Sequence, residues 1–535
     1  MDPTSSQQEE HLQPGLTASH TALLLVSVAI ISICAILYEL LISTISSYFQ
    51  GSSILHFSLV IGLFLSFMGL GSYLSKFVIR GLLRWFILFE IWLGIIGGFS
   101  SAILYLAFSL TPYFYLTAFI LLGTLGTLIG LEIPLLTRMI NRYEGLRDAM
   151  AKVLSFDYLG ALIASVLFPL LLLPTLGVMR TAFGIGMLNL VVAALNTWQF
   201  RADLPDYRRM IILCTLGGGL LLAGFGYSFQ ITRFFENFLY QDEIMLSRQS
   251  AYQQIVITQW NDDTRLFLDG NLQFSSKDEY RYHEPLVHIP LQLAAHTGRI
   301  LILGGGDGMV AREVLKHAQV QTVDLVDLDP EITRLATSHP VLIRLNDSSM
   351  LDPRVRIVNE DGYKFIENGT DLYDVIIIDL PDPNHTALGK LYTAEFYGLI
   401  SRRLAAGGVV VTQSTSPYFA PRAFWCIHHT LASVFPATIP YQVYVPSFGQ
   451  WGFNLALKTS PRLAGLHAGP AQDSLLHSLT RRLQERPVSL RYLTPAIAAT
   501  LFVFDGDTQA VPAEVNHLDN QILVQYYENS WNQWR

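Results

Sequence analysis

Charged residues, cysteines and an excess of basic charge are scarce or absent in this chain. Only 15% of its 535 residues are charged, whereas ordinary soluble proteins carry roughly 25%, and its mean hydropathy is +0.36. This composition argues against a wholly soluble globular protein. Three cysteines, two of them inside apolar runs, exclude a disulfide framework. The formal net charge of −8 argues against a nucleic-acid partner and favours cationic ligands.

Long apolar runs are confined to the first 228 residues. Each run is about long enough to cross a ~30 Å hydrocarbon core as a helix. Residues 1–19 form a polar lead-in and not a secretory signal, because they contain no Lys or Arg. The sequence therefore predicts a multi-pass α-helical bundle in the lipid bilayer of the plasma or inner membrane, with about seven spans at 20–47, 54–79, 83–108, 113–139, 157–176, 181–199 and 210–228.

The rest of the chain alternates short strand-like and helix-like segments, as a doubly wound α/β domain does. A strand at 299–303 leads into a glycine-rich turn at 304–308 and then into a helical segment. Glycines there, including Gly304 and Gly306, allow the backbone to approach a ligand closely. A second strand ends in Asp327 and Asp329, either of which can accept the hydroxyls of a ribose. This pattern predicts a Rossmann-like nucleoside-binding domain over 291–460, after a β-hairpin part over 229–290 and before a C-terminal extension over 461–535.

Acidic residues also close the next two predicted strands. Asp361 follows the strand at 355–358, where it could meet an adenine amino group. Asp379 ends the buried strand at 373–379, and Asp382 follows three residues later. Ligands of such sheets bind beyond the carboxyl ends of the strands, so this pair could bind and deprotonate an amine. Taken without the other motifs, the two acids would be helix-cap and turn residues.

At this point the chain resembles a known family, the polyamine aminopropyltransferases or spermidine synthases. The resemblance runs in family order from about residue 245 to 460, through Tyr252-Gln253, Asp269-Gly270 with Gln273, Asp278-Glu279, Tyr282-His283-Glu284, the turn at 304–308, Asp327, Asp361-Gly362, Asp379 with Asp382, and Leu391-Tyr392. The apolar first half, with residues 446–449 and 451–453, resembles the bacterial membrane-bound branch of that family. Residues 491–534 resemble it too, although no chemistry can be attached to them.

The resemblance implies a reaction and a role for each matched residue. The family transfers the aminopropyl group of decarboxylated S-adenosylmethionine to putrescine, giving spermidine and 5'-methylthioadenosine. Asp379 resembles the catalytic acid–base residue, with a tyrosine as a conceivable relay. Binders of the methylthioadenosine part are implied at Gln253, Asp327, Asp361, Gly362, Gly304 and Gly306, and amine contacts at His283, Asp307, Asp382, Tyr282 and Tyr444.

Charge accounts for the implied choice of donor. An acid at Asp307 attracts the donor amine and repels intact S-adenosylmethionine, which carries a carboxylate in the same region. Decarboxylated S-adenosylmethionine is then a co-substrate, and no cofactor is expected. The histidines are scattered, and the pair His428-His429 lacks ligand partners, so no metal site is expected either. Partners are expected to be small polyamine substrates and further copies of the chain, in a homodimer or larger homo-oligomer.

One segment departs from the family pattern. Where soluble members carry a Gly-Pro pair after Asp-Pro, this chain has the residues at 384–390. This departure puts the donor contact and the acceptor amine in question. Two other functions stay open: a methyltransferase that uses intact S-adenosylmethionine on the same nucleoside fold, and a polyamine transporter or sensor whose soluble half binds without turnover.

The charges of the loops conflict with this chemistry. Basic residues gather at 76–84, 138–152 and 201–209, and the positive-inside rule places these three loops in the cytoplasm. Seven spans would then put the C-terminal half outside, whereas its expected donor is made in the cytosol. We expect a cytosolic catalytic domain, so that either one apparent span fails to cross or one span has been missed.

Acidic residues within the apolar half have two possible roles. Glu39, Glu90, Glu132 and Asp157 lie within or at the ends of the predicted spans. Acids in hydrocarbon are costly and usually face a polar interior or a partner. They either mark a cation path or polyamine site, or pair with Arg138 or Arg180, or hydrogen-bond within the bundle.

Overall fold

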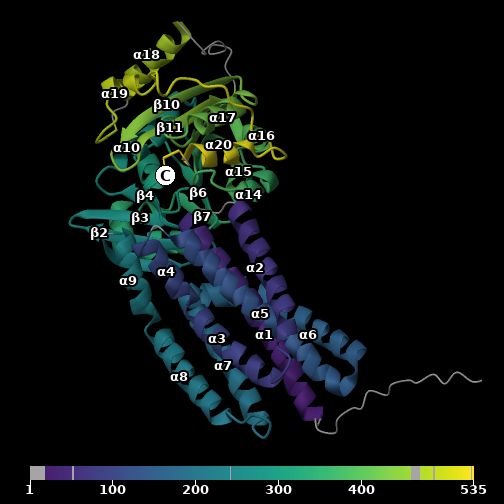
Figure 1. Cartoon of the computed structure of the whole chain (residues 1–535). Coiled ribbons are helices and arrows are strands. Elements are labelled where there is room, and N and C mark those ends of the chain that lie inside the picture. Colours follow the sequence, from purple (N-terminus) through teal and green to yellow (C-terminus); the bar gives the residue numbers. More distant parts are fainter. Residues whose placement is uncertain are drawn as a thin grey trace, which may run out of the picture. The chain divides into compact units, whose positions relative to one another are not determined.

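The computed structural model divides the chain into two compact units, Met1–Ile244 and Met245–Arg535. It describes residues 18–50, 54–111, 113–240, 242–458, 470–485, 488–531 and 533–534. Figure 1 shows helices alone in the first unit up to residue 240, and mixed helices and strands in the second. The sequence thus predicted the order correctly: a region of apolar helices, then an α/β domain.

The first unit is a bundle of long helices. They are α1 Ala18–Gln50, α2 Ile54–Leu74, α3 Leu82–Gly98, α4 Ser100–Leu110, α5 Phe114–Glu144, α6 Leu146–Leu167, α7 Leu173–Gln199, α8 Tyr207–Gly226 and α9 Ser228–Tyr240. Glycines allow some of these helices to touch. A Cβ atom on Gly71 of α2 would lie 2.1 Å from the Thr127 carbonyl oxygen of α5. A Cβ atom on Gly130 of α5 would lie 2.0 Å from the Met68 carbonyl oxygen of α2. Small residues at such crossings are typical of membrane bundles.

The predicted count of seven spans is not confirmed. Five helices of the described chain are long and apolar enough to cross a membrane, or six if the bent pair α3 and α4 makes one span. The runs predicted at 157–176 and 181–199 fall in one helical stretch, Leu146–Gln199, which contains a π-helical turn at Phe168–Leu172 and a kink at Gly177 (φ 69°, ψ 176°). Hydropathy registers a run but not a bend within it.

The two intramembrane arginines bond to neutral groups. The Arg138 guanidinium donates to the carbonyl oxygens of Val78 and Ser75 at 3.0 and 2.8 Å. Arg180 donates to the Ser228 hydroxyl at 3.0 Å.

Two of the four acids within the apolar helices have no hydrogen-bond partner in the part of the chain that the structure describes. The carboxylates of Glu90 on α3 and Glu132 on α5 are 0% exposed and have no hydrogen-bond partner among the described residues. The alternative in which these two pair with Arg138 or Arg180 is therefore not seen.

The second unit begins with a four-stranded sheet in the order β1-β2-β3-β4. Its strands are β1 Glu243–Gln249, β2 Gln254–Trp260, β3 Asp263–Leu268 and β4 Asn271–Ser275. The predicted strands thus lie in a larger sheet than one hairpin, with the expected turn at Asp269 and Gly270, where φ is +47° and +76°. Apolar residues of this sheet, such as Ile255 and Phe274, share a core with Met309 and Ile332 of the following domain.

A seven-stranded sheet forms the centre of the second unit, in the order β10-β11-β9-β8-β5-β6-β7. Its strands are β5 Arg299–Gly304, β6 Thr322–Asp327, β7 Val355–Asn359, β8 Tyr373–Asp379, β9 Leu404–Gln413, β10 Ala437–Val445 and β11 Gly449–Leu457. The chain runs from β5 outward to β7 and then returns to β8 on the other side of β5, with β5 to β9 parallel. A ligand crevice is expected at that reversal, beyond the carboxyl ends of β5 and β8.

Helices cover both faces of this sheet, and two apolar clusters fill the space between them (Figure 1). The helices of this domain are α10 Tyr280–Leu293, α11 Met309–Leu315, α12 Pro330–Ser338, α13 Pro340–Leu345, α14 Gly362–Asn368, α15 Thr386–Gly389, α16 Ala394–Arg403 and α17 Pro421–Ala432. The C-terminal extension adds α18 Pro470–Glu485, α19 Pro495–Thr500 and α20 Ile522–Trp531, and Leu479 and Leu523 of these helices belong to the same clusters.

Candidate active site

The glycine-rich turn joins β5 to α11 at the centre of the large sheet. Gly304 has φ +83°, and a Cβ atom on it would lie 2.0 Å from the Asp379 carbonyl oxygen. A residue with a side chain could not let the ends of β5 and β8 approach so closely. A Cβ atom on Gly306 would lie 2.5 Å from Oδ2 of Asp327. The turn therefore brings the backbone and Asp327 together at the ligand edge of the sheet.

The two acids considered for a ribose have different surroundings. Asp329 caps α12 with one oxygen, and its other oxygen accepts hydrogen bonds from Ser250 Oγ at 2.7 Å and Gln253 Nε2 at 3.0 Å. Asp327 accepts backbone N–H groups of Gly306 and Asp329 at 3.0 and 2.9 Å. Burial raises the pKa of Asp327 to about 6. Asp329 thus accepts hydrogen bonds from side chains and from a helix terminus, whereas those of Asp327 come from backbone N–H groups.

Asp361 has a partner that sequence analysis did not identify. It caps α14, which begins at Gly362, by accepting the Tyr363 backbone N–H at 2.8 Å. Its Oδ2 atom accepts a 2.7 Å hydrogen bond from Nζ of Lys390, which lies in the segment that departs from the family pattern. Burial opposes ionisation, but the hydrogen bond and charge of Lys390 outweigh it and lower the pKa of Asp361. An adenine amino group would share this carboxylate with Lys390.

Asp379 is held by a tyrosine. Its Oδ1 atom accepts a 2.6 Å hydrogen bond from the hydroxyl of Tyr282, which lies on α10 and is 8% exposed. Burial raises the pKa of Asp379 to about 6, and the charge of His283 opposes that rise. A carboxylate with this pKa is largely ionised at neutral pH and is a stronger base than an ordinary aspartate.

His283 and Asp307 lie within electrostatic range of Asp379. Nδ1 of His283 is 2.7 Å from Oε2 of Glu279, and Arg312 donates two hydrogen bonds to the same carboxylate, at 2.8 and 3.0 Å. Burial opposes the charged form, but Glu279 outweighs it and raises the pKa of His283. Burial also raises the pKa of Asp307, against the charge of His283. Several titratable groups thus lie together beyond the carboxyl ends of β5 and β8.

Asp382 accepts hydrogen bonds from three residues that sequence analysis missed. The Tyr527 hydroxyl donates at 2.8 Å, Gln413 Nε2 at 3.4 Å and Thr415 Oγ1 at 3.5 Å. Burial raises the pKa of Asp382 to about 6, and these three hydrogen bonds oppose the rise. Thr415 has φ +58°, a strained conformation for a β-branched residue, as is common at functional sites. The donors lie 31 to 145 residues from Asp382, so no local motif contained them.

The structure does not bring Tyr444 together with these acids. Its side chain on β10 is 56% exposed. Tyr444 lies near the end of β10, on the face opposite to the buried Tyr441, Val443 and Val445, although Gln442 on its own face is buried. Tyr441 is the residue that reaches inward, where its hydroxyl donates to the Pro285 carbonyl at 3.1 Å.

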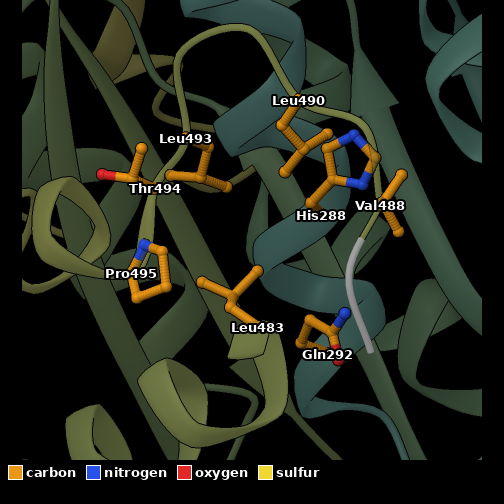
Figure 2. A pocket seen from close by; sticks show the side chains of 8 residues that line it. All are labelled: His288, Gln292, Leu483, Val488, Leu490, Leu493, Thr494 and Pro495. Carbon is orange, nitrogen blue, oxygen red and sulfur yellow. The ribbon is translucent and has the colours of Figure 1, made fainter. Parts of the chain in front are cut away.

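A cavity of about 230 Å³ lies elsewhere in the second unit and is lined by none of the predicted site residues. Figure 2 shows side chains of α10, α18, the segment before α19 and the first residue of α19 around it, with His288 and Gln292 supplied by α10. The two ring nitrogens of His288 bond to His317 and Glu313 at 2.8 and 2.9 Å. Within the described chain, no group of three or more His, Cys, Asp and Glu is arranged to hold a metal ion.

Comparisons with known proteins show which family this chain is similar to. Residues 279–464 match the model of the spermine/spermidine synthase domain family. The chain is 44% identical to a polyamine aminopropyltransferase of Leptospira interrogans over 95% of this chain and 98% of the relative. It is 39% identical to a protein of the same name from Oceanobacillus iheyensis, over 95% and 97% of the two chains. A crystal structure of spermidine synthase in complex with the transition-state analogue AdoDATO is 28% identical and aligns with a TM-score of 0.44, over 49% of this chain and 86% of that chain.

The similarity to the relatives extends over nearly the whole length of both chains, including the apolar helices. Motifs, fold and relatives therefore agree that the chain belongs to the polyamine aminopropyltransferase family and is an enzyme that transfers aminopropyl groups in polyamine biosynthesis.

Proposed function

We propose that the second unit transfers the aminopropyl group of decarboxylated S-adenosylmethionine to putrescine, with Asp379 as the acid–base residue. The observation that carries this proposal is that Asp307, Asp379 and Asp382 all lie at or just after the carboxyl ends of the neighbouring strands β5 and β8. Burial raises the pKa of all three carboxyl groups. Each accepts at least one hydrogen bond from the chain. Such acids favour a ligand that brings positive charge, as both proposed substrates do.

Donor binding follows the strand ends. Asp327 would accept the ribose hydroxyls, and Asp361 would accept the adenine amino group in competition with Lys390. Gln253, which donates a hydrogen bond to Asp329, would contact the methylthioadenosine part. Asp307, close to His283, is proposed to receive the donor amine and to repel the carboxylate of intact S-adenosylmethionine.

In the chemical step one proton is transferred, one carbon–nitrogen bond forms and one carbon–sulfur bond breaks. Alkyl amines resemble lysine, with a pKa of ~10.4, so the attacking nitrogen must lose a proton. Asp379 accepts that proton while the nitrogen lone pair attacks the methylene carbon next to the sulfonium. The carbon–sulfur bond breaks, its electrons return to sulfur, and neutral methylthioadenosine leaves. Tyr282 orients the carboxylate through its 2.6 Å hydrogen bond, and alignment of nitrogen and carbon adds a proximity effect.

The test is product analysis with the purified full-length chain. Decarboxylated and intact S-adenosylmethionine are each supplied with putrescine, cadaverine and longer amines, and products are identified by mass spectrometry. We expect spermidine and methylthioadenosine in equal amounts from putrescine and the decarboxylated donor. A methylated product from the intact donor would support a methyltransferase, and saturable amine binding without product would support a sensor.

We propose further that the first unit anchors the enzyme as in the bacterial membrane-bound branch, with the second unit in the cytosol. Six spans, with the bent pair counted as one, are an even number and return both chain ends to one side. This count places the basic loop at 201–209 opposite the loops at 76–84 and 138–152. A reporter fused after Arg535 and a cysteine label in the 201–209 loop therefore test the proposal together. An exported reporter would contradict it.

A further inference from the structure

The C-terminal extension, to which no motif assigns chemistry, reaches Asp382. Helix α20 carries Tyr527, whose hydroxyl donates to Oδ2 of Asp382 at 2.8 Å across 145 residues of chain. The other two donors to this carboxylate, Gln413 and Thr415, are 3.4 and 3.5 Å away. Hydrogen bonds to an ionised group are strongest when short. Of the three side chains that donate to Asp382, Tyr527 therefore makes the strongest hydrogen bond.

The position of α20 does not depend on that hydrogen bond. Asn516, which is 0% exposed, donates to the carbonyl oxygens of Gly389 and Tyr392 at 3.2 and 3.1 Å. Its Oδ1 atom accepts the backbone N–H of Leu523, a fully buried residue of α20. The helix is thus tied to the segment that follows Asp382 through the backbone and the core.

Aromatic packing holds the other end of α20. The rings of Trp531 and Phe419 stack with centroids 5.7 Å apart and planes 20° apart. Trp534 donates its indole N–H to the Phe419 carbonyl oxygen at 3.2 Å. Phe419 follows the loop that contains Thr415, so the extension contacts the Asp382 surroundings at two points.

We infer that Tyr527 is a positioning residue for the acceptor amine, and that the C-terminal extension supplies one wall of the acceptor site. The inference rests on the proposed function, in which Asp382 binds the amine. An ionised carboxylate offers about four lone-pair positions. The Tyr527 hydroxyl occupies one of them on Oδ2 and fixes the plane of the carboxylate; Thr415 and Gln413 approach Oδ2 and Oδ1 at longer distances, which leaves at least one position for an ammonium group. The ligand class is thus a primary alkylammonium end of a diamine.

The test compares Tyr527→Phe with Tyr526→Phe in the full-length enzyme. The control hydroxyl lies on the same helix but bonds to Glu514 at 3.1 Å. For Tyr527→Phe we expect the KM for the diamine to rise about tenfold, the loss of one hydrogen bond to a charged group. The KM for the donor and kcat at saturating diamine should stay within about twofold of wild type, a change too small for the loss of a strong interaction. The acid limb of kcat/KM for the diamine should move to higher pH, because Asp382 loses a donor that stabilises its ionised form.

Asp382→Asn and the double variant separate this inference from the proposed function. If Asp382→Asn leaves the diamine KM unchanged, the proposed role of Asp382 is wrong. If it raises that KM while Tyr527→Phe matches Tyr526→Phe, only the inference is overturned. In the Asp382→Asn background the Tyr527 change should have no further effect on KM, and two independent, multiplying effects would contradict the inference. Equal losses in both KM values and kcat for Tyr527→Phe would also overturn it, because they indicate general damage to the unit.

Discussion

Buried acids in the two units differ in what the chain provides for them. In the second unit Asp379 accepts a hydrogen bond from Tyr282, and Asp382 accepts three. In the first unit Glu90 and Glu132 are fully buried, more so than Asp379 and Asp382, yet their oxygens have no hydrogen-bond partner in the described chain. An acid oriented by donors is prepared for a ligand, whereas an unpartnered acid in a membrane bundle must be neutral or meet a group from outside the chain. Acidic residues thus occur in two environments, one with hydrogen-bond donors and one without. The proposed mechanism of aminopropyl transfer uses only the acids that have donors.

Among the acids that accept hydrogen bonds in the second unit, Asp379 should show the largest effect when it is replaced, in the variant Asp379→Asn. The amide keeps the shape of the side chain but cannot take a proton from the amine. We expect turnover to fall by ~10²–10⁴-fold, the usual contribution of a general base, while donor binding measured by calorimetry stays near wild type. Near-normal turnover of a folded Asn variant would remove Asp379 from the mechanism.

Asp307→Asn should change donor choice more than rate. The variant loses both its attraction for the donor amine and its repulsion of a carboxylate. We expect the kcat/KM ratio of decarboxylated to intact S-adenosylmethionine to fall by about 10–100-fold, the value of one or two interactions with a charged group. The measurement is a competition assay with both donors present. A ratio equal to that of wild type would show that another residue discriminates.

The pH profile follows from the raised pKa of Asp379, which burial places at about 6. The ionised form is the base, so kcat should fall as pH drops through about 6 and should be insensitive to this group above about 7. Below the pKa the fall should approach tenfold per pH unit. An acid limb of the kcat profile near pH 4 would mean that the Asp379 carboxyl group titrates as an exposed aspartate does, which would contradict the effect of its burial.

The unpartnered pair should matter least for catalysis. Glu90→Gln and Glu132→Gln keep the shape of each side chain and remove its charge, and Glu39→Gln is a matched control on α1. We expect aminopropyl transfer to stay within about twofold of wild type in all three. The melting temperature of the detergent-solubilised chain should be unchanged or higher for the first two, because an unpaired buried ionisable group is removed. A large loss of turnover in a folded Glu90 or Glu132 variant would show that acids without hydrogen-bond donors also contribute to aminopropyl transfer.

Sequence analysis reached the acids of the site but not the donors that hold them. Asp327, Asp379 and Asp382 follow predicted strands, and parallel strands bring their carboxyl ends to one edge, so local pattern was sufficient. Tyr527 and Gln413 come from distant parts of the chain and meet Asp382 only through the tertiary fold. Lys390 lies in a segment whose departure from the family was visible, whereas its hydrogen bond to Asp361 was not.

The helical unit shows a different limit of sequence reasoning. Composition located the apolar runs, and the structure has helices at all of them. The number of spans depended on the kink at Gly177 and on the bend between α3 and α4, neither of which changes the hydropathy of the run. The role implied for Tyr444 stays a prediction, and the exposure of its side chain depends on how β10 packs in the fold.

The central claim is that all residues needed for transfer lie in the second unit, and its most direct measurement is the activity of residues 242–535 alone, with β1 kept whole. We predict that this fragment folds and makes spermidine from putrescine and the decarboxylated donor with kcat/KM within about threefold of the full chain, since a compact unit with its own core can fold independently. Circular dichroism and size-exclusion chromatography establish that the fragment is folded and record its oligomeric state. A folded fragment in the same oligomeric state as the full chain but without activity would contradict the claim and assign part of the catalysis to the helical unit.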